Sequence, residues 1–210
     1  MIGHPSYFEE ESPRAEILQG AMEEFIEFGK KGARMQSIAD RAGVNKALLH
    51  YYFSTKENLH KEVLRRAFEK GFSQISQSLE IPMEPADQIR SLIHSYFEFF
   101  RKFPELPKLM IHEITSSPQE VAEFFGKLFS ENPNYPRAFA EVIKEGIARN
   151  QFKPVDPRQF LITTISSIIF FFVAKPLFID ILEIEDGDQF LDERLDHLQE
   201  ILMDGLERSP

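Results

Sequence analysis

The chain of 210 residues lacks cysteine, and this absence excludes disulfides, thiolate metal sites and cysteine nucleophiles. It also lacks an N-terminal targeting signal, because residues 1–11 have neither a basic start nor an apolar run and contain three consecutive glutamates. A chain without cysteine suits a reducing compartment. We therefore expect a protein that is not exported and that works in the cytoplasm.

Signatures of common enzymes are absent as well. The sequence has no glycine-rich phosphate loop, no nucleophile elbow, no zinc-protease motif and no kinase signature. A metal site built from His94, His112 and Glu113 is conceivable, but these residues do not show metal-ligand spacing within one helix. We therefore expect no catalytic residue, no metal and no cofactor.

No segment alternates strictly between apolar and polar residues, so strands are not expected. Apolar residues instead recur at helical spacing, which predicts an all-α fold. The first helix should open at Ser12, with Pro13 in its first turn, and end at Gly29 and Gly32. A capping box opening at Ser54 predicts a long helix. The remaining helices are expected at 36–42, 46–52, 86–102, 105–116, 118–130, 136–150, 157–182 and 189–207.

Charge is distributed unevenly along the chain. The formal net charge is -10 at pH 7, which by itself argues against a nucleic-acid partner because phosphates would be repelled. Residues 30–70 nevertheless contain ten basic and four acidic residues, while the rest of the chain contains 14 basic and 30 acidic residues. A basic module on an acidic body fits nucleic-acid binding, although a merely solvated helix surface would carry similar charges.

The basic segment contains the pattern of a helix-turn-helix. It reads MQSIADRAGV, NKALLHYYF and STKENL over residues 35–59. Gly43 lies where the turn between the two short helices can require a positive φ angle, and Asn45 lies where it can cap the second helix. The first turn of that helix, with Lys46, would then enter a major groove. The apolar residues that should pack this motif are Ile38, Ala39, Val44, Leu49 and Phe53.

Over residues 17–64 the sequence resembles the TetR family of bacterial one-component regulators. The motifs that carry the resemblance are the pair Ile38-Ala39, the segment Ala42 to Val44, the pair Tyr52-Phe53 and the Ser-x-Lys-Glu-x-Leu pattern from Ser54 to Leu59. The second motif helix departs from the family's usual residues, so the operator sequence does not follow from the resemblance. What it implies is a DNA-binding transcriptional regulator, expected to be a repressor, that reads a pseudo-palindromic operator in double-stranded DNA as a homodimer.

The resemblance also implies which residues meet DNA. Contacts to base edges or methyl groups are expected from Lys46, Ala47, Leu48, His50 and Tyr51, and contacts to phosphates from Arg34, Tyr52 and Lys56. Lys56 has an independent argument, because it lies in the first turn of a helix, where unpaired N–H groups favour an anion. For Tyr51 and Tyr52, partial burial in the motif's own core is the alternative.

Prolines divide the helices into two unequal domains, with Pro82 and Pro85 at the boundary. The expected organisation is a helix-turn-helix domain at 1–55 with an acidic extension at 1–11, a connecting helix at 56–81, and a larger helical domain for ligand binding and dimerisation at 82–210. The resemblance implies a pocket in the larger domain for an unidentified small effector, which should be apolar or aromatic. Its candidate residues are His94, Tyr96, Phe97, Phe100, Met110, His112 and Phe125, with ordinary core packing as the alternative for each.

Residues 160–179 are the most apolar stretch of the chain and are about as long as a membrane span. Hydroxyl side chains dilute the first half of this stretch, and Lys175 and Pro176 interrupt the second. We therefore expect no membrane contact and a helix buried against a partner subunit in a four-helix bundle. The expected interface residues are Ile165, Ile169, Phe172, Leu195, Leu198 and Leu202.

One other function class remains open from the sequence. A helical small-molecule-binding protein could retain the helix-turn-helix motif without binding DNA specifically. Binding to a specific duplex would exclude it.

Overall fold

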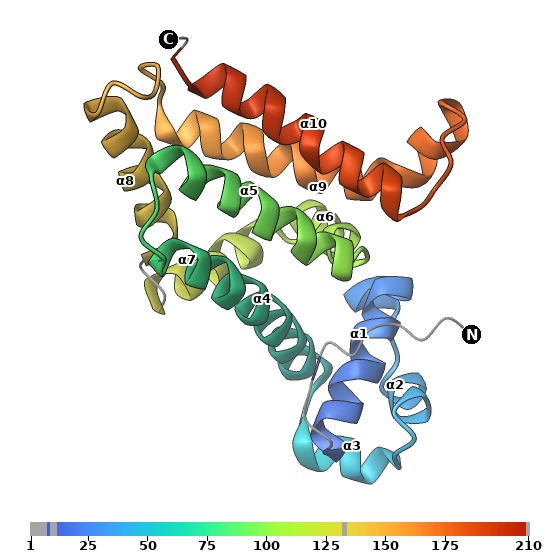
Figure 1. The fold of residues 1–210 in the computed structure, drawn as a ribbon. Coiled ribbons are helices and arrows are strands. Elements are labelled where there is room, and N and C mark those ends of the chain that lie inside the picture. The colour runs from blue at the N-terminus through green and yellow to red at the C-terminus, as the bar shows by residue number, and fades with distance from the viewer. Residues whose placement is uncertain (1–7, 9–11, 132–133, 209–210) are drawn as a thin grey trace. The chain divides into compact units, whose positions relative to one another are not determined.

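The structure is a computed structural model that describes residue 8, residues 12–131 and residues 134–208 (Figure 1). Over these residues it contains ten α-helices and no strand, which confirms the predicted all-α fold. A single isolated bridge joins Phe152 to Glu207.

The helix boundaries lie within two residues of those predicted from the sequence. They are α1 Pro13–Gly32, α2 Met35–Arg41, α3 Lys46–Tyr52, α4 Lys56–Glu80, α5 Pro85–Lys102, α6 Leu106–Ser116, α7 Pro118–Glu131, α8 Asn134–Ala148, α9 Pro157–Ile181 and α10 Asp188–Leu206.

Local chemistry explains most helix ends. Ser12 caps α1 as predicted, because its hydroxyl oxygen accepts the N–H of Ala15 at 3.2 Å. Gly29, with φ 63°, interrupts α1 before its last turn. The prediction that Ser54 opens α4 is wrong by one residue, because the hydroxyl oxygen of Thr55 accepts the N–H of Asn58 at 3.1 Å.

The chain forms two compact units. The N-terminal unit contains residues 1–70 together with residues 108–121, and the C-terminal unit contains residues 71–107 and 122–210. Most of α6, together with the first turn of α7, therefore belongs to the same unit as the first helices of the chain. The contiguous domain boundaries expected from the sequence stay a prediction.

In the N-terminal unit, α1 and α2 approach each other closely at Gly20. A Cβ at this position would lie 3.0 Å from the backbone nitrogen of Ala42 and 3.1 Å from the carbonyl oxygen of Ile38. A larger residue would push the two helices apart. The predicted packing residues Ile38 and Leu49 are fully buried, so α2 and α3 rest on a shared small core.

In the C-terminal unit, α5 lies against α8, α9 and α10 (Figure 1). Phenylalanines fill the space between these helices, with the Phe97 ring 5.1 Å from the ring of Phe172 and 6.0 Å from the ring of Phe171. The predicted alternative of ordinary core packing therefore holds for many of the phenylalanines.

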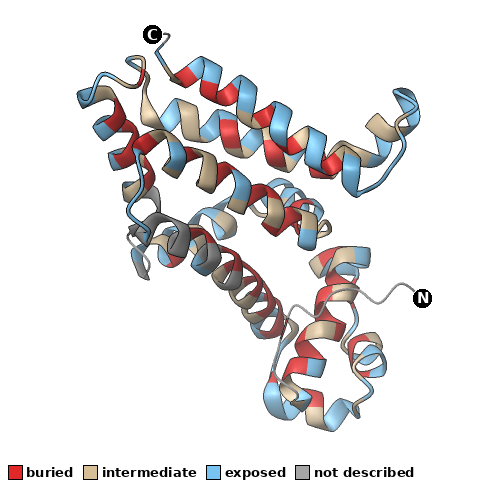
Figure 2. Ribbon diagram, in the orientation of Figure 1, coloured by how far each residue is buried: buried red, intermediate tan, exposed pale blue. Residues whose placement is uncertain are grey.

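Helix α9 differs from its neighbours because it is apolar almost all round. By length and composition it could cross a membrane, but one such helix is weak evidence, since core helices of soluble proteins pass the same test. Only 22% of its most apolar stretch is buried within the protein. Figure 2 shows the alternation of buried and exposed positions along α9 and α10. The described residues therefore leave one face of α9 without a cover.

Candidate nucleic-acid interface and effector site

The turn between α2 and α3 has the geometry that the sequence predicted. Gly43 has φ 66°, in the left-handed region that favours glycine. Asn45 caps α3, because its side-chain oxygen accepts the N–H of Leu48 at 2.8 Å. The N–H of Val44 donates to the carbonyl oxygen of Ala39 at 3.0 Å and closes the turn. These bonds fix the direction in which α3 leaves the turn.

Helix α3 presents one face to the core and the other to solvent. Leu49 is buried, whereas Lys46, Ala47 and His50 are exposed and Leu48 is half-buried. Tyr51 is 82% exposed, so burial in the motif's own core does not apply to it. Tyr52 is also exposed, and its ring lies 5.4 Å from that of Tyr51 in an edge-to-face contact. The five residues predicted to contact bases are thus exposed or half-buried on α3, and their contacts with DNA stay a prediction.

The residues expected to bind phosphate differ in their surroundings. Arg34 is exposed at the start of α2. Lys56 is half-buried, and its ammonium donates to the carbonyl oxygens of Lys31 at 3.3 Å and Ala33 at 3.0 Å. These two bonds use two of its three N–H donors to hold the end of α1. Lys56 therefore has a structural role that the sequence did not reveal, beside the predicted one.

A buried carboxylate supports the start of α2. Glu24, on α1, is 2% exposed and accepts the backbone N–H of Arg34 at 3.2 Å and Nε of Arg41 at 2.9 Å. Hydrogen bonding to Glu27, together with Glu24, raises the pKa of Arg41 above its ordinary value. Arg41 is thus paired with carboxylates of α1, so its charge is not available to bind a phosphate.

A second charge network neutralises part of the basic segment on α4. Arg65 donates to Glu62 and Glu69, and Arg66 donates to Glu62 at 3.2 Å. Although burial opposes the ionised form of Glu62, the hydrogen bonds from Arg65 and Arg14 hold its pKa at about 2. Along this stretch of α4, ion pairs with Glu62 and Glu69 therefore take up the charges of Arg65 and Arg66.

The predicted pocket residues differ in their burial, and their role as a pocket stays a prediction. Phe97, Phe100 and Tyr96 are buried in the core of the C-terminal unit, Phe125 is half-buried, and His94 is exposed. Burial raises the pKa of the Tyr96 hydroxyl.

Met110 and His112 belong to the N-terminal unit. The ring of His112 lies so close to Gly29 that a Cβ there would collide with it. Among the described residues, no group of three or more His, Asp or Glu could hold a metal ion.

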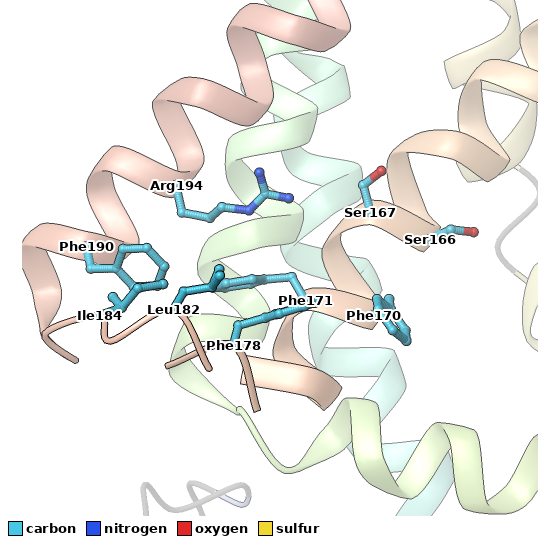
Figure 3. Close-up of a pocket in the computed structure, with 9 residues that line it drawn as sticks. All are labelled: Ser166, Ser167, Phe170, Phe171, Phe178, Leu182, Ile184, Phe190 and Arg194. Carbon is cyan, nitrogen blue, oxygen red and sulfur yellow. The ribbon is translucent and has the colours of Figure 1, made fainter. Parts of the chain in front are cut away.

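The hollow in the C-terminal unit was missed by the sequence reasoning. It has a volume of about 630 Å³ and lies between α9, α10 and the segment that joins them (Figure 3). Its lining consists of Ser166, Ser167, Phe170, Phe171, Phe178, Leu182, Ile184, Phe190 and Arg194. The spacing of Phe190 and Arg194, four residues apart on α10, is the signal that could have placed them on one helix face.

Comparison with known proteins gives the family of this chain. Residues 17–63 match the family described as bacterial regulatory proteins of the tetR family, and residues 82–209 match the tetracyclin repressor-like C-terminal domain. The chain belongs to the TetR family. It is therefore a DNA-binding transcriptional regulator, and the alternative of a helical ligand-binding protein without specific DNA binding is set aside.

Individual relatives of this TetR-family chain span most of its length. The HTH-type transcriptional regulator RutR of Escherichia coli O157:H7 is 27% identical over 192 residues, which cover 90% of this chain and 88% of RutR. The structure of the ketosteroid transcriptional regulator KstR2 of Mycobacterium tuberculosis has a TM-score of 0.77 at 18% identity and covers 98% of this chain and 100% of that one. The regulator FadR from Bacillus subtilis, in complex with stearoyl-CoA, has a TM-score of 0.69 at 17% identity and covers 90% of this chain and 97% of that one. At these identities the two structures show a shared fold.

The TetR-family chain does not expose most of the side chains that were expected to form its dimer interface. Phe172, Leu195, Leu198 and Leu202 are buried within the protomer, and Ile165 and Ile169 are half-buried. The leucine stripe of α10 therefore packs inside its own subunit, so its buried members offer little surface to a second copy. The large apolar side chains that α9 and α10 leave exposed are instead Ile162, Phe170, Leu177, Ile181 and Ile201.

Proposed function

We propose that this TetR-family protein acts in the cytoplasm as a homodimeric repressor that binds a pseudo-palindromic operator and is released by a small effector. The observation that carries the DNA-binding part is the exposed face of α3, held on a rigid turn by the Asn45 cap and the Gly43 backbone. A rigid element that projects several polar and aromatic side chains suits insertion into a major groove.

The side chains on this face suggest a division between reading and positioning. Lys46 can donate to the O6 and N7 atoms of guanine, whereas Ala47 and Leu48 can only pack against groups such as the thymine methyl. Arg34 lies at the start of α2, where its guanidinium is exposed and suited to a phosphate. Selection of genomic fragments by the purified protein, followed by footprinting, tests the proposal. Failure to enrich any duplex would refute it.

The dimer part of the proposal rests on the apolar face of α9. The side chains of Ile181 and Phe170 are 64% and 62% exposed. Large exposed apolar patches are uncommon on monomers, so this face is suited to cover by a partner. A two-fold axis beside α9 and α10 would cover this face in both copies at once.

Charged residues on that face should separate the copies. Ile162→Glu and Ile181→Glu are expected to sediment as monomers and to lose operator binding together. Ile114→Glu, at an exposed apolar position on α6, serves as the matched control and should remain dimeric. If both α9 variants sediment as dimers, the interface lies elsewhere.

Two of the structural relatives indicate which class of effector to expect. KstR2 is a ketosteroid regulator and FadR is in complex with stearoyl-CoA, and both ligand classes have a large apolar body. An apolar effector would release DNA only if it binds the two conformations of the dimer differently, and a coupling of about 1–3 kcal/mol would suffice. Transcription from the selected operator with and without the regulator tests repression. Higher transcription in its presence would make the protein an activator.

A further inference from the structure

Arg194 is distinguished from neighbouring arginines by its lack of an anionic partner. Within the described residues it forms no hydrogen bond or ion pair, and its guanidinium carbon lies 5.3 Å from the centre of the Phe171 ring. In the same unit, Arg90, Arg101 and Arg149 each pair with carboxylates. The chain has 34 acidic and 24 basic residues, so an arginine without a carboxylate is unexpected.

The sequence of α10 explains why Arg194 lacks a partner on its own helix. Side chains three or four residues apart are neighbours on a helix, and these positions hold Phe190, Leu191, His197 and Leu198. The nearby acids of α10, at 192, 193 and 196, point to other sides. Arg194 is also half-buried, and this burial lowers the pKa of its guanidinium. A partly desolvated charge without a partner is costly, so an anion at this position would remove a cost that the isolated chain bears.

The hollow around Arg194 is apolar on its other sides. Figure 3 shows the Arg194 side chain reaching from α10 over Phe171, while Phe178, Phe190 and Ile184 lie farther along the hollow. The polar side chains in the lining are Arg194 and the two serines at its rim, one of which, Ser167, already donates its hydroxyl to the carbonyl oxygen of Thr163 at 2.8 Å. Its volume of about 630 Å³ falls within the range of small-molecule sites, roughly 300–1,000 Å³.

We infer that the hollow between α9 and α10 binds a small carboxylate with an apolar chain, with the carboxylate on Arg194 and the chain against the phenylalanine rings. A guanidinium presents two parallel N–H donors that match a carboxylate, and an apolar chain is the complement of this lining. This inference rests on the proposed function, because it names the chemical class of the proposed effector and the site where it binds.

The main competing occupant is the second copy, because the hollow opens beside the exposed side chain of Phe170 on the face proposed for dimerisation. A carboxylate of the second copy could reach Arg194 in its place. Removal of the Arg194 guanidinium would affect the dimer differently for the two occupants. Loss of a ligand contact leaves the dimer intact, whereas loss of an interface ion pair weakens it.

Dodecanoate and dodecanol are suitable probes, because they share an apolar chain and differ in charge. Titration calorimetry of the full-length dimer should show dodecanoate binding about ten- to a hundredfold more tightly than dodecanol, as expected for charge-assisted hydrogen bonds. Arg194→Gln should reduce dodecanoate binding to the level of dodecanol and leave dodecanol binding unchanged. Arg158→Gln is the matched control and should behave as wild type, because Arg158 is an exposed arginine of α9 that pairs with Asp156.

Thermal unfolding separates this role from a structural one. Arg194→Gln loses the contact with the Phe171 ring but also removes a partly desolvated charge that has no anionic partner among the described residues, so the stability of the ligand-free protein should change little. Equal binding of the two probes to wild type would overturn the inference, as would unchanged dodecanoate binding by Arg194→Gln. Monomers formed by Arg194→Gln would assign the guanidinium to the second copy. Operator binding by the ligand-free protein, measured in parallel, tests the proposed function independently.

Discussion

Replacing Glu24 with glutamine should destabilise the helix-turn-helix more than a substitution at any nearby surface residue. Glu24 is buried and accepts two hydrogen bonds, from the backbone N–H of Arg34 and from Nε of Arg41. Hydrogen bonds to a charged group contribute about 1.5–3 kcal/mol each. Glutamine has a similar shape and can retain one neutral bond, and Arg41 keeps its contact with Glu27. We therefore expect Glu24→Gln to lower the free energy of unfolding by about 2–3 kcal/mol.

The exposed partner of the same arginine provides the control. Glu27 is exposed, and pairs of this kind contribute about 0–1 kcal/mol, so Glu27→Gln should cost about 0.5 kcal/mol. Urea unfolding followed by the helical signal measures both variants. Glu24→Gln should also weaken binding to operator and scrambled DNA alike, because it disturbs the start of α2 and not the exposed side chains of α3 that are proposed to contact bases. Equal destabilisation by the two variants would refute the assignment of Glu24 as the support of α2.

Two further predictions concern DNA reading and acid stability. Lys46→Ala should reduce the binding free energy by on the order of 1–3 kcal/mol per half-site on the preferred operator and by little on scrambled DNA. Arg34→Ala should weaken binding to both duplexes equally. Titration of each variant with both duplexes checks this, and equal losses of affinity for Lys46→Ala would exclude base reading. The pKa of Glu62 is about 2 in the folded protein against an ordinary 4.5, so its ion pairs stabilise the fold above about pH 4.5 and this contribution is lost as the pH falls toward 2. Acid titration of stability should be flatter for Glu62→Gln than for wild type over that range, and parallel curves would contradict the role of Glu62.

The helices of this protein could be predicted from the sequence because their ends depend on local chemistry. Ser12 and Asn45 cap their helices through bonds to residues three positions away, and prolines open several of the others. The error at α4 has the same origin, since Ser54 and Thr55 both carry a hydroxyl and only the backbone decides which one accepts.

The exposed side chains of α3 were also predictable, whereas the hollow and the apolar side chains that α9 and α10 leave exposed were not. Burial of Leu49 sets the phase of α3, and the other side chains follow from the helical period. On α9 and α10, no single buried residue sets the phase of the helix in this way. An apolar helix does not reveal whether a side chain packs within its own subunit, as Leu198 does, or remains exposed, as Phe170 does.

Ion pairing also limits how many cations of the basic segment can meet DNA. Residues 30–70 contain ten basic residues, but Lys30, Arg41, Arg65 and Arg66 contact carboxylates in the folded protein. With about two or three phosphate contacts per half-site, a dimer should show a slope of about -4 to -5 when the logarithm of operator affinity is plotted against that of salt concentration. Filter binding between low and physiological salt measures this slope. A value near twice that size would mean that the paired arginines leave their carboxylates to bind phosphate, and Glu62→Gln would then strengthen DNA binding.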